Sequence, residues 1–219
     1  MMKKLSFIII STVLACFSLF IVEQLLDVSY LIKTGSKICL FLLIPIIYLV
    51  IYKEKIRFKV YTSEIKYGLL IGLASLFIVL IAYYFFQSLI DSKSIISDLK
   101  SSSITASNFI LIGLYITFGN SFLEEFFFRG FIFLKIYDAG YKKFAYLFSA
   151  GLFAIYHIAI FVTWFEAWIT LLALIGLFAI GIVFNLINLK SRSFINSWII
   201  HICADTAVIL IGLSLFGII

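Results

Sequence analysis

Proline, charge and histidine are all scarce in this chain. One proline and two histidines occur among 219 residues, and only 13% of the residues are charged, about half the share found in soluble domains. Apolar residues make up 64% of the chain and the mean hydropathy is +1.19, which excludes an ordinary soluble domain. No polar stretch is long enough to bury a core of its own, so we expect residues 1–219 to form a single integral membrane domain.

Cysteine is also rare and carries little chemical information. Cys16, Cys39 and Cys203 lie within or beside apolar runs, and they lack the CxxC spacing and the even number of a disulfide framework. We interpret them as small packing residues. The segment that ends at Cys16 resembles a bacterial lipoprotein signal, but the apolar run continues to Val22, which favours a retained first helix over cleavage.

The apolar runs are long enough to cross a membrane. A transmembrane helix needs about 20 mainly apolar residues, and runs of this order recur along the chain. We therefore expect an all-α, polytopic transmembrane helix bundle of about seven spans, with six to eight as the range. The expected spans are 5–23, 36–52, 67–90, 108–134, 144–163, 167–188 and 194–218.

The segments between the spans differ in character. The longest connection, Asp91 to Ser107, is rich in serine and is expected to be a surface connection with at most an interfacial turn. Residues 1–90 carry no recognisable motif, so the role of the N-terminal helices is left unassigned. The residues suited to chemistry fall within 108–210.

Lysine and arginine accumulate in alternate connections, as the cytoplasmic loops of membrane proteins do. This bias predicts a cytoplasmic N-terminus and a C-terminus outside. One side holds Lys3, Lys4, Lys53, Lys55, Arg57, Lys59, Lys66, Lys135, Lys142, Lys143, Lys190 and Arg192, and the other holds Lys33, Lys37, Lys93 and Lys100. Because the formal charge of +6 lies in loops, we expect the lipid bilayer as a partner and no nucleic acid.

Six ionisable side chains nevertheless lie inside the apolar segments. Burying a charge in a bilayer is costly, so such residues usually face one another around a site or pathway. They are Glu124, Glu125, Arg129, His157, His201 and Asp205.

Their spacing predicts how they pair along each helix. Glu125 and Arg129 are four residues apart and can pair on one helix face, as can His201 and Asp205. Glu124 is rotated by about 100° from its neighbour and has no cation beside it in the sequence. The Glu125–Arg129 pair on its own fits an internal ion pair better than a direct catalytic role.

This inventory suits hydrolysis of a peptide bond inside a membrane. The reaction needs a base for water, a group that holds the water, and donors for the oxyanion of the tetrahedral intermediate. Two adjacent glutamates in unlike environments can divide such roles. Either histidine taken alone fits an interhelical hydrogen bond equally well.

Three short motifs follow one another on three apolar segments, in the order Glu124-Glu125-xxx-Arg129, Phe153-xxx-His157 and His201-xxx-Asp205. In this order they resemble the motifs of the CPBP (CAAX protease and bacteriocin-processing, or Abi) intramembrane proteases, which are related to the type II CAAX prenyl endopeptidase. The resemblance covers about residues 108–210, half of the chain.

The resemblance implies a glutamate-dependent endopeptidase. Glu124 would activate water together with His157, while His201 and the residue at position 205 would stabilise the oxyanion. The implied catalytic residues are Glu124, His157, His201 and Asp205, and the implied supporting residues are Glu125 and Arg129.

Asp205 departs from the family, which more often has asparagine at this position. An ionised aspartate cannot donate a hydrogen bond to an oxyanion, so Asp205 is protonated, orients His201, or binds a metal. Glu124, His157, His201 and Asp205 would make a reasonable Zn²⁺ site with room for water. The absence of an HExxH motif favours a site without metal or other cofactor.

Two functions of other classes stay open beside the protease. One is a non-catalytic bacteriocin immunity or partner-binding protein of the same fold, and the other is an ion-coupled transporter, although no inverted halves are visible. For the protease, we expect the substrate to be a membrane-associated peptide or a precursor protein, cleaved near the cytoplasmic face. The composition favours a bacterial cell membrane.

Overall fold

A computed structural model of the chain describes residues 2–56, 58 and 62–219, and the side chains of all of these except 62–64. Every regular element in this described part is a helix, which confirms the all-α prediction. Two residues of the charge count, Arg57 and Lys59, lie outside the described residues.

Seven of the described helical segments are long and apolar enough to cross a membrane, which confirms the predicted number of spans. They are Met2–Gln24, Tyr30–Tyr52, Ile65–Leu89, Phe109–Asp138, Lys142–Phe161, Ala167–Ser191 and Ile195–Leu215. Their bounds agree with the expected ones to within a few residues, except that the second span begins six residues earlier than expected.

The first three spans are built from the elements α1 (Met2–Gln24), α2 (Tyr30–Ile38), α3 (Ile44–Tyr52) and α4 (Thr62–Phe86). A π-helical stretch, Cys39–Leu43, joins α2 to α3 directly before the only proline, Pro45. Proline lacks the N–H that an α-helix needs at this point, and the wider π-helical turn accommodates it.

A short helix, α5 (Ser92–Ser101), occupies the connection that was expected to be a loop, so that expectation is wrong. Asp91 caps it, because its side chain accepts hydrogen bonds from the backbone N–H groups of Lys93 and Ser94 at 3.1 and 3.2 Å. Polar residues cover most of this helix while Ile95 is buried, a pattern that composition alone did not reveal.

The fourth span is continuous but not uniformly α-helical. It consists of α6 (Phe109–Leu114), a π-helical stretch (Tyr115–Asn120), α7 (Ser121–Glu125), a second π-helical stretch (Phe126–Phe133) and α8 (Leu134–Asp138). The remaining elements are α9 (Lys142–Tyr156), α10 (Ile158–Phe161), α11 (Ala167–Ser191) and α12 (Ile195–Leu215).

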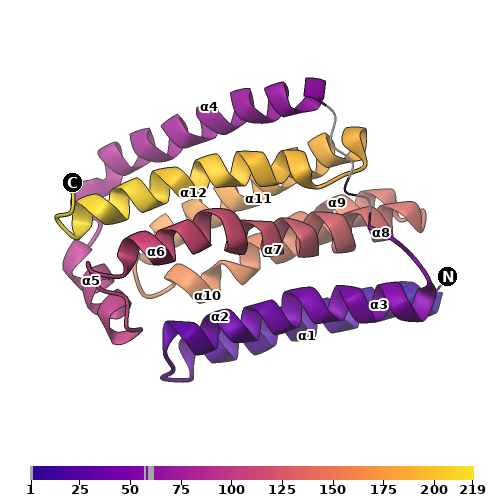
Figure 1. Cartoon of the computed structure of the whole chain (residues 1–219), viewed down its shortest axis with the longest axis horizontal. Coiled ribbons are helices and arrows are strands. Elements are labelled where there is room, and N and C mark those ends of the chain that lie inside the picture. The colour runs from indigo at the N-terminus through magenta and orange to yellow at the C-terminus, as the bar shows by residue number, and fades with distance from the viewer. Residues whose placement is uncertain (1, 57, 59–61) are drawn as a thin grey trace.

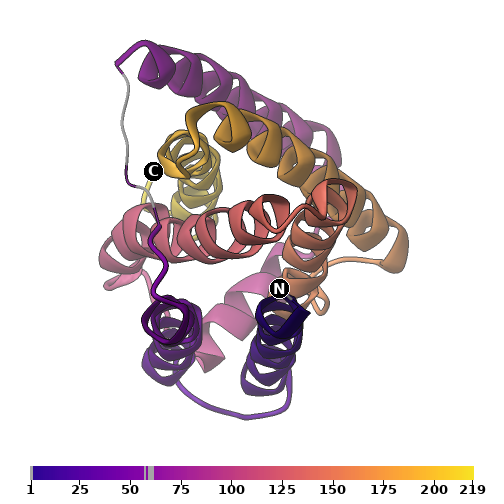
Figure 2. The ribbon, with the colours of Figure 1, turned by 90° about the vertical axis from the view of Figure 1, so that its right-hand side faces the viewer.

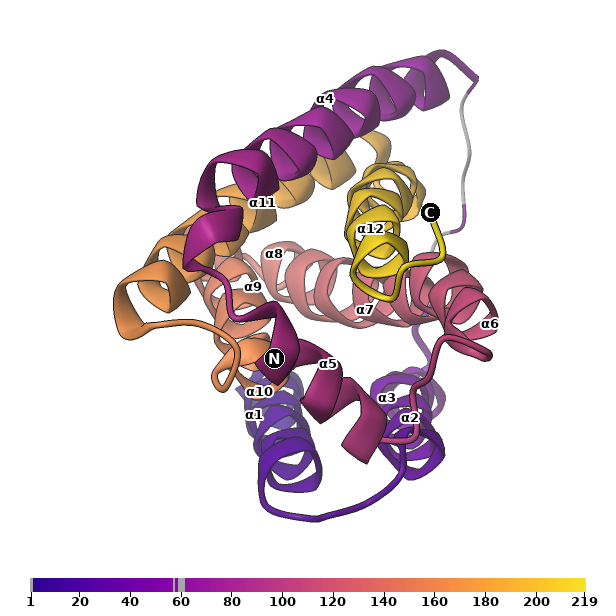
Figure 3. The ribbon, with the colours of Figure 1, turned by 90° about the vertical axis from the view of Figure 1, so that its left-hand side faces the viewer.

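The fourth span crosses the middle of the bundle. Figures 1 to 3 show α1, α2 and α3 together on one side of it and α4 on the far side, packed against α12. The helices α9 and α11 contact each other and complete the bundle. The two chain ends lie at opposite ends of the bundle (Figure 1), as an odd number of spans requires.

Phenylalanine fills the centre of the bundle around the fourth span. Phe127, Phe128, Phe131 and Phe133 have no exposed surface. Phe41 stacks on Phe127 with ring centroids 4.1 Å apart, which ties the second span to the fourth. This packing makes the fourth span the fixed element on which a site can be built.

Candidate functional site

The first motif lies in the most buried part of the fourth span. Glu124 is the sixteenth of the 30 residues of Phe109–Asp138, so it lies at the middle of the helix rather than clearly in its inner half. Glu124 is 1% exposed, and Glu125 and Arg129 are completely buried. The π-helical stretches on either side of α7 change the direction of its side chains, and such stretches occur frequently at functional sites.

The two oxygens of Glu124 have different surroundings. Oε1 accepts hydrogen bonds from Nδ2 of Asn120 at 2.9 Å and from Nζ of Lys37 at 3.3 Å. Oε2 has no hydrogen-bond partner among the described residues, and it faces Nε2 of His157 at 3.7 Å and Nε2 of His201 at 3.9 Å. One oxygen is therefore held in place while the other is directed at both imidazoles.

His157 ends α9, where its ring is anchored by the backbone. Its Nδ1 lies 2.7 Å from the carbonyl oxygen of Phe153, one turn earlier. A carbonyl oxygen can only accept, so Nδ1 carries the proton and a neutral His157 presents the lone pair of Nε2. The second motif thus fixes the tautomer that faces Glu124.

His201 is anchored by the glutamate that was expected only to support the site. Its Nδ1 lies 2.9 Å from Oε1 of Glu125, which also accepts from Nη1 of Arg129 at 3.0 Å. The predicted pair of Glu125 and Arg129 is therefore present, and a histidine on α12 joins it. The Arg129 guanidinium also lies 3.9 Å from the centre of the Phe153 ring.

Asp205 lies one turn after His201 on α12, as its spacing predicts. Its Oδ1 is 3.6 Å from Nε2 of His201, and no described group hydrogen-bonds to its Oδ2. Its side chain keeps 16% of its surface exposed and that of His157 keeps 14%, whereas Glu124 has almost none. Asp205 and His157 are therefore the least buried of the six ionisable residues.

Two residues of this cluster were missed in the sequence. Lys37 was counted with a connection although it lies at the edge of the expected span 36–52; in the structure this span begins at Tyr30, and the lysine is buried beside Glu124. The inference that Glu124 lacks a cation is therefore wrong, because the cation comes from another helix. Asn120 could have been found, since it precedes Glu124 by one helical turn. Nothing in the sequence near Lys37 indicates its partner.

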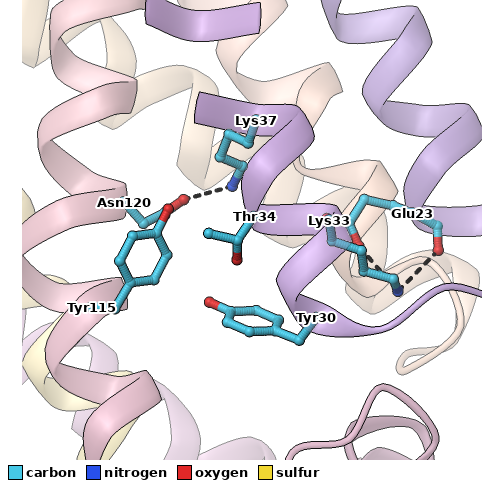
Figure 4. Close-up of a pocket in the computed structure, with 7 residues that line it drawn as sticks. All are labelled: Glu23, Tyr30, Lys33, Thr34, Lys37, Tyr115 and Asn120. Carbon is cyan, nitrogen blue, oxygen red and sulfur yellow. Dashed lines mark hydrogen bonds and ion pairs between the residues drawn. The ribbon is translucent and has the colours of Figure 1, made fainter. Parts of the chain in front are cut away.

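A small polar pocket lies beside Lys37 and Asn120 (Figure 4), the two residues that donate hydrogen bonds to Oε1 of Glu124. Its volume is about 20 Å³, and it lies between the end of α1 and the beginning of α2 on one side and the fourth span on the other. It is lined by Glu23, Tyr30, Lys33, Thr34, Lys37, Tyr115 and Asn120.

The structure brings together all six ionisable residues that the sequence selected. The imidazoles of His157, at the end of α9, and of His201, on α12, both lie near Oε2 of Glu124, at 3.7 and 3.9 Å. Within the described ranges, no three histidine, cysteine, aspartate or glutamate side chains are arranged to hold a metal ion. The preference for a site without metal stays a prediction.

Comparison with known proteins identifies the same part of the chain. Residues 106–207 match the family model described as type II CAAX prenyl endopeptidase Rce1-like. No curated protein and no solved structure matches the chain. The matched region begins before α6 and ends inside α12, so it includes all three motifs but not Lys37.

Proposed function

We propose that the chain is an intramembrane endopeptidase that uses a glutamate-activated water, because residues 106–207 match the Rce1-like type II CAAX prenyl endopeptidase family. One observation carries the proposal. Oε2 of Glu124 is buried, has no hydrogen-bond partner among the described residues, and faces the imidazoles of two different helices.

The proposed base is Glu124 together with His157. A water molecule beside Oε2 of Glu124 and Nε2 of a neutral His157, to one side of the 3.7 Å line between them, would donate one hydrogen to each, since both atoms accept. Its oxygen lone pair is then directed away from both acceptors, toward a peptide carbonyl. The carboxylate takes the proton as the water attacks and passes it to the leaving amine.

The proposed oxyanion donor is His201. Glu125 accepts the Nδ1 proton of His201, so in the proposed role His201 is the doubly protonated imidazolium, whose second proton, on Nε2, is directed into the space beside Oε2 of Glu124. Oxyanion donors of this kind contribute about 10²–10³ in kcat. Asp205, 3.6 Å from the same Nε2, either donates as a neutral acid or holds this nitrogen in position.

We propose that the substrate is a membrane-associated peptide or a precursor protein. Glu124 is buried at the middle of a 30-residue span, so the scissile bond must enter the bundle. Each buried glutamate is matched by a cation, Glu124 by Lys37 and Glu125 by Arg129. We infer that the reaction proceeds without a metal ion.

The test compares new protein termini in membranes. Cells that lack the gene would express the wild type, Glu124→Gln or His157→Ala at equal levels, and mass spectrometry would identify the termini of membrane and secreted proteins. We expect one or more cleavage sites that appear only with the wild type. A synthetic peptide spanning such a site would then be cleaved by the purified wild type in detergent and not by either variant.

A matched control separates hydrolysis from binding. Glu23→Gln removes a partly buried carboxylate at the end of α1, which forms an ion pair with Lys33 and does not contact the histidines. This variant should therefore cleave like the wild type. Termini that are identical in all four strains would overturn the protease assignment. If protection against a bacteriocin persisted in the Glu124→Gln strain under those conditions, the immunity alternative would replace it.

A further inference from the structure

We propose that Lys37 is a positioning residue for the reaction, which holds Glu124 so that only one of its oxygens serves as the base. This inference rests on the proposed protease function and extends it to a helix outside the matched family region. The ammonium of Lys37 and the carboxylate of Glu124 come from residues 87 positions apart. The first half of the chain thereby contributes to the site.

The contacts of Lys37 define this role. Its Nζ lies 2.6 Å from Oδ1 of Asn120 and 3.3 Å from Oε1 of Glu124, and Nδ2 of the same asparagine donates to that oxygen at 2.9 Å. Lysine only donates and a carboxylate only accepts, so this arrangement fixes the orientation of the Asn120 amide. Rotation of the Glu124 carboxylate would break two hydrogen bonds, and Oε2 therefore stays directed at the imidazoles.

The pocket explains how an ammonium group is maintained at this depth. A cavity holds a water molecule from about 10–15 Å³ upward if polar groups surround it, and this pocket has about 20 Å³. Besides Lys37 and Asn120 it offers the hydroxyl groups of Tyr30, Thr34 and Tyr115 as partners (Figure 4). Water in this pocket would solvate the side of Lys37 that faces away from Glu124.

Two other cations of the bundle, Arg129 and Lys33, are paired with carboxylates other than Glu124. Arg129 is engaged by Glu125 at 3.0 Å, and Lys33 is engaged by Glu23 at 3.2 Å. Within the described part of the chain, Lys37 is the only lysine or arginine that forms an ion pair with Glu124. Without it, Asn120 alone would hold Oε1, and the carboxylate could rotate away from its present orientation more easily.

The first experiment measures kcat and KM separately for the peptide substrate. Lys37→Met keeps the length and apolar character of the side chain but removes the charge. We expect kcat to fall about 10²-fold, as misplacement of a reacting group by about 1 Å can cause, while KM changes less than twofold. Lys4→Met is the control, because it removes a lysine that forms an ion pair with Glu54 outside the polar pocket, and it should retain the wild-type kcat.

The second experiment is chemical rescue, which a purely structural role would not show. Lys37→Ala leaves space beside the polar pocket, and methylammonium or ethylammonium in the buffer should restore kcat at least tenfold in a saturable manner. The neutral alcohol of similar size should restore nothing, and Glu124→Ala should not respond to either amine. Thermal unfolding of each variant in detergent shows whether the fold is retained.

The outcomes separate this inference from the proposed function. A wild type that cleaves, with a Lys37→Met variant of equal kcat, would overturn the positioning role and leave the protease intact. Loss of cleavage by Lys37→Ala without rescue by any amine would also overturn it. A wild type that cleaves nothing would remove the proposed function and the role of Lys37 together.

Discussion

Nδ1 of His201 lies 2.9 Å from Oε1 of Glu125, so the second glutamate of the first motif directly anchors a histidine of the third motif. The same oxygen accepts from Arg129 at 3.0 Å. A residue expected to be an internal ion-pair partner therefore also sets the orientation of the proposed oxyanion donor. Glu125 therefore contributes to stability through Arg129 and to the proposed reaction through His201.

Variants of Glu125 should separate these two contributions. Glu125→Ala leaves the completely buried Arg129 without a partner, and breaking a buried ion pair costs about 3–5 kcal/mol. We expect a correspondingly lower free energy of unfolding in detergent. The double variant Glu125→Ala/Arg129→Met should recover most of this loss, because replacing both partners by apolar groups is often neutral.

Cleavage should not recover in the double variant, since His201 has lost the acceptor of its Nδ1 proton. We expect kcat at least tenfold below the wild type in both variants. Full cleavage by the stable double variant would show that Glu125 acts only through folding.

Asp205→Asn should keep activity. The amide of asparagine can donate a hydrogen bond in the position where Asp205 lies, 3.6 Å from Nε2 of His201. We expect kcat within about threefold of the wild type for Asn, and a loss of about 10²–10³ for Asp205→Ala if a donor to the oxyanion is removed. Loss of cleavage in Asp205→Asn would instead assign the negative charge of Asp205 to the reaction.

Replacement of Gly181 by alanine should lower the stability of the fold. A Cβ atom at this position would lie 3.1 Å from Cβ and 3.2 Å from Cα of Ala150 on α9, and 3.4 Å from Nη2 of Arg129. We expect Gly181→Ala to lower the free energy of unfolding by about 1–3 kcal/mol through overpacking. Gly176→Ala on the same helix meets nothing within 4 Å and should be neutral or stabilising. Equal effects of the two substitutions would contradict this close approach of α11 to α9.

The loop residue Glu54 should make stability depend on pH. Partial burial favours the neutral acid, but hydrogen bonds from Lys4 and Lys135 outweigh this and hold the pKa of Glu54 below its ordinary value of 4.5. The distances are 2.6 Å to Lys4 and 2.9 Å to Lys135. Because the pKa is lower in the folded state, this contribution is complete above 4.5 and is lost as the pH falls through the folded-state pKa.

Thermal unfolding of the wild type and Glu54→Gln should therefore be compared from pH 7 down to pH 3. We expect the wild type to have the higher Tm at pH 7 and the difference between the two proteins to shrink below pH 4.5. A difference that stays constant over this range would show that the carboxylate charge contributes nothing.

Chelators should not affect cleavage. Lys37 places a positive charge 3.3 Å from Oε1 of Glu124, and such a charge disfavours a divalent cation at the same carboxylate. We expect purified protein treated with 1,10-phenanthroline or EDTA to keep its kcat, and elemental analysis to find less than one equivalent of zinc. Inactivation by the chelator that added Zn²⁺ reverses would revive the ligand set of Glu124, His157, His201 and Asp205.

Much of the fold could be predicted from the sequence because hydropathy is a local property. A run of apolar residues reveals a span without any knowledge of its neighbours, and seven spans were expected and found. The errors lie at the edges of spans, where a lysine can extend into the bundle. Lys37 looked like a loop residue for this reason, and α5 was overlooked because its polar surface resembles a connection.

The candidate site was also partly visible, because charge inside apolar segments is costly and so stands out. Spacing of four residues predicted the pair of Glu125 and Arg129 and the proximity of His201 and Asp205, both of which occur in the structure. Contacts between helices could not be predicted in this way. The bond between His201 and Glu125 joins residues 76 positions apart and depends on how α12 is rotated against α7.

The amino-acid sequence alone determined the class of protein, the number of spans and six of the ionisable residues of the cluster, since each follows from the chemistry of side chains in or out of lipid. Only the tertiary structure decided which oxygen of Glu124 faces the imidazoles and which cation holds the other one. The physical reason is that the rotation and depth of each helix are set by packing around the buried phenylalanines, and no local pattern encodes these quantities.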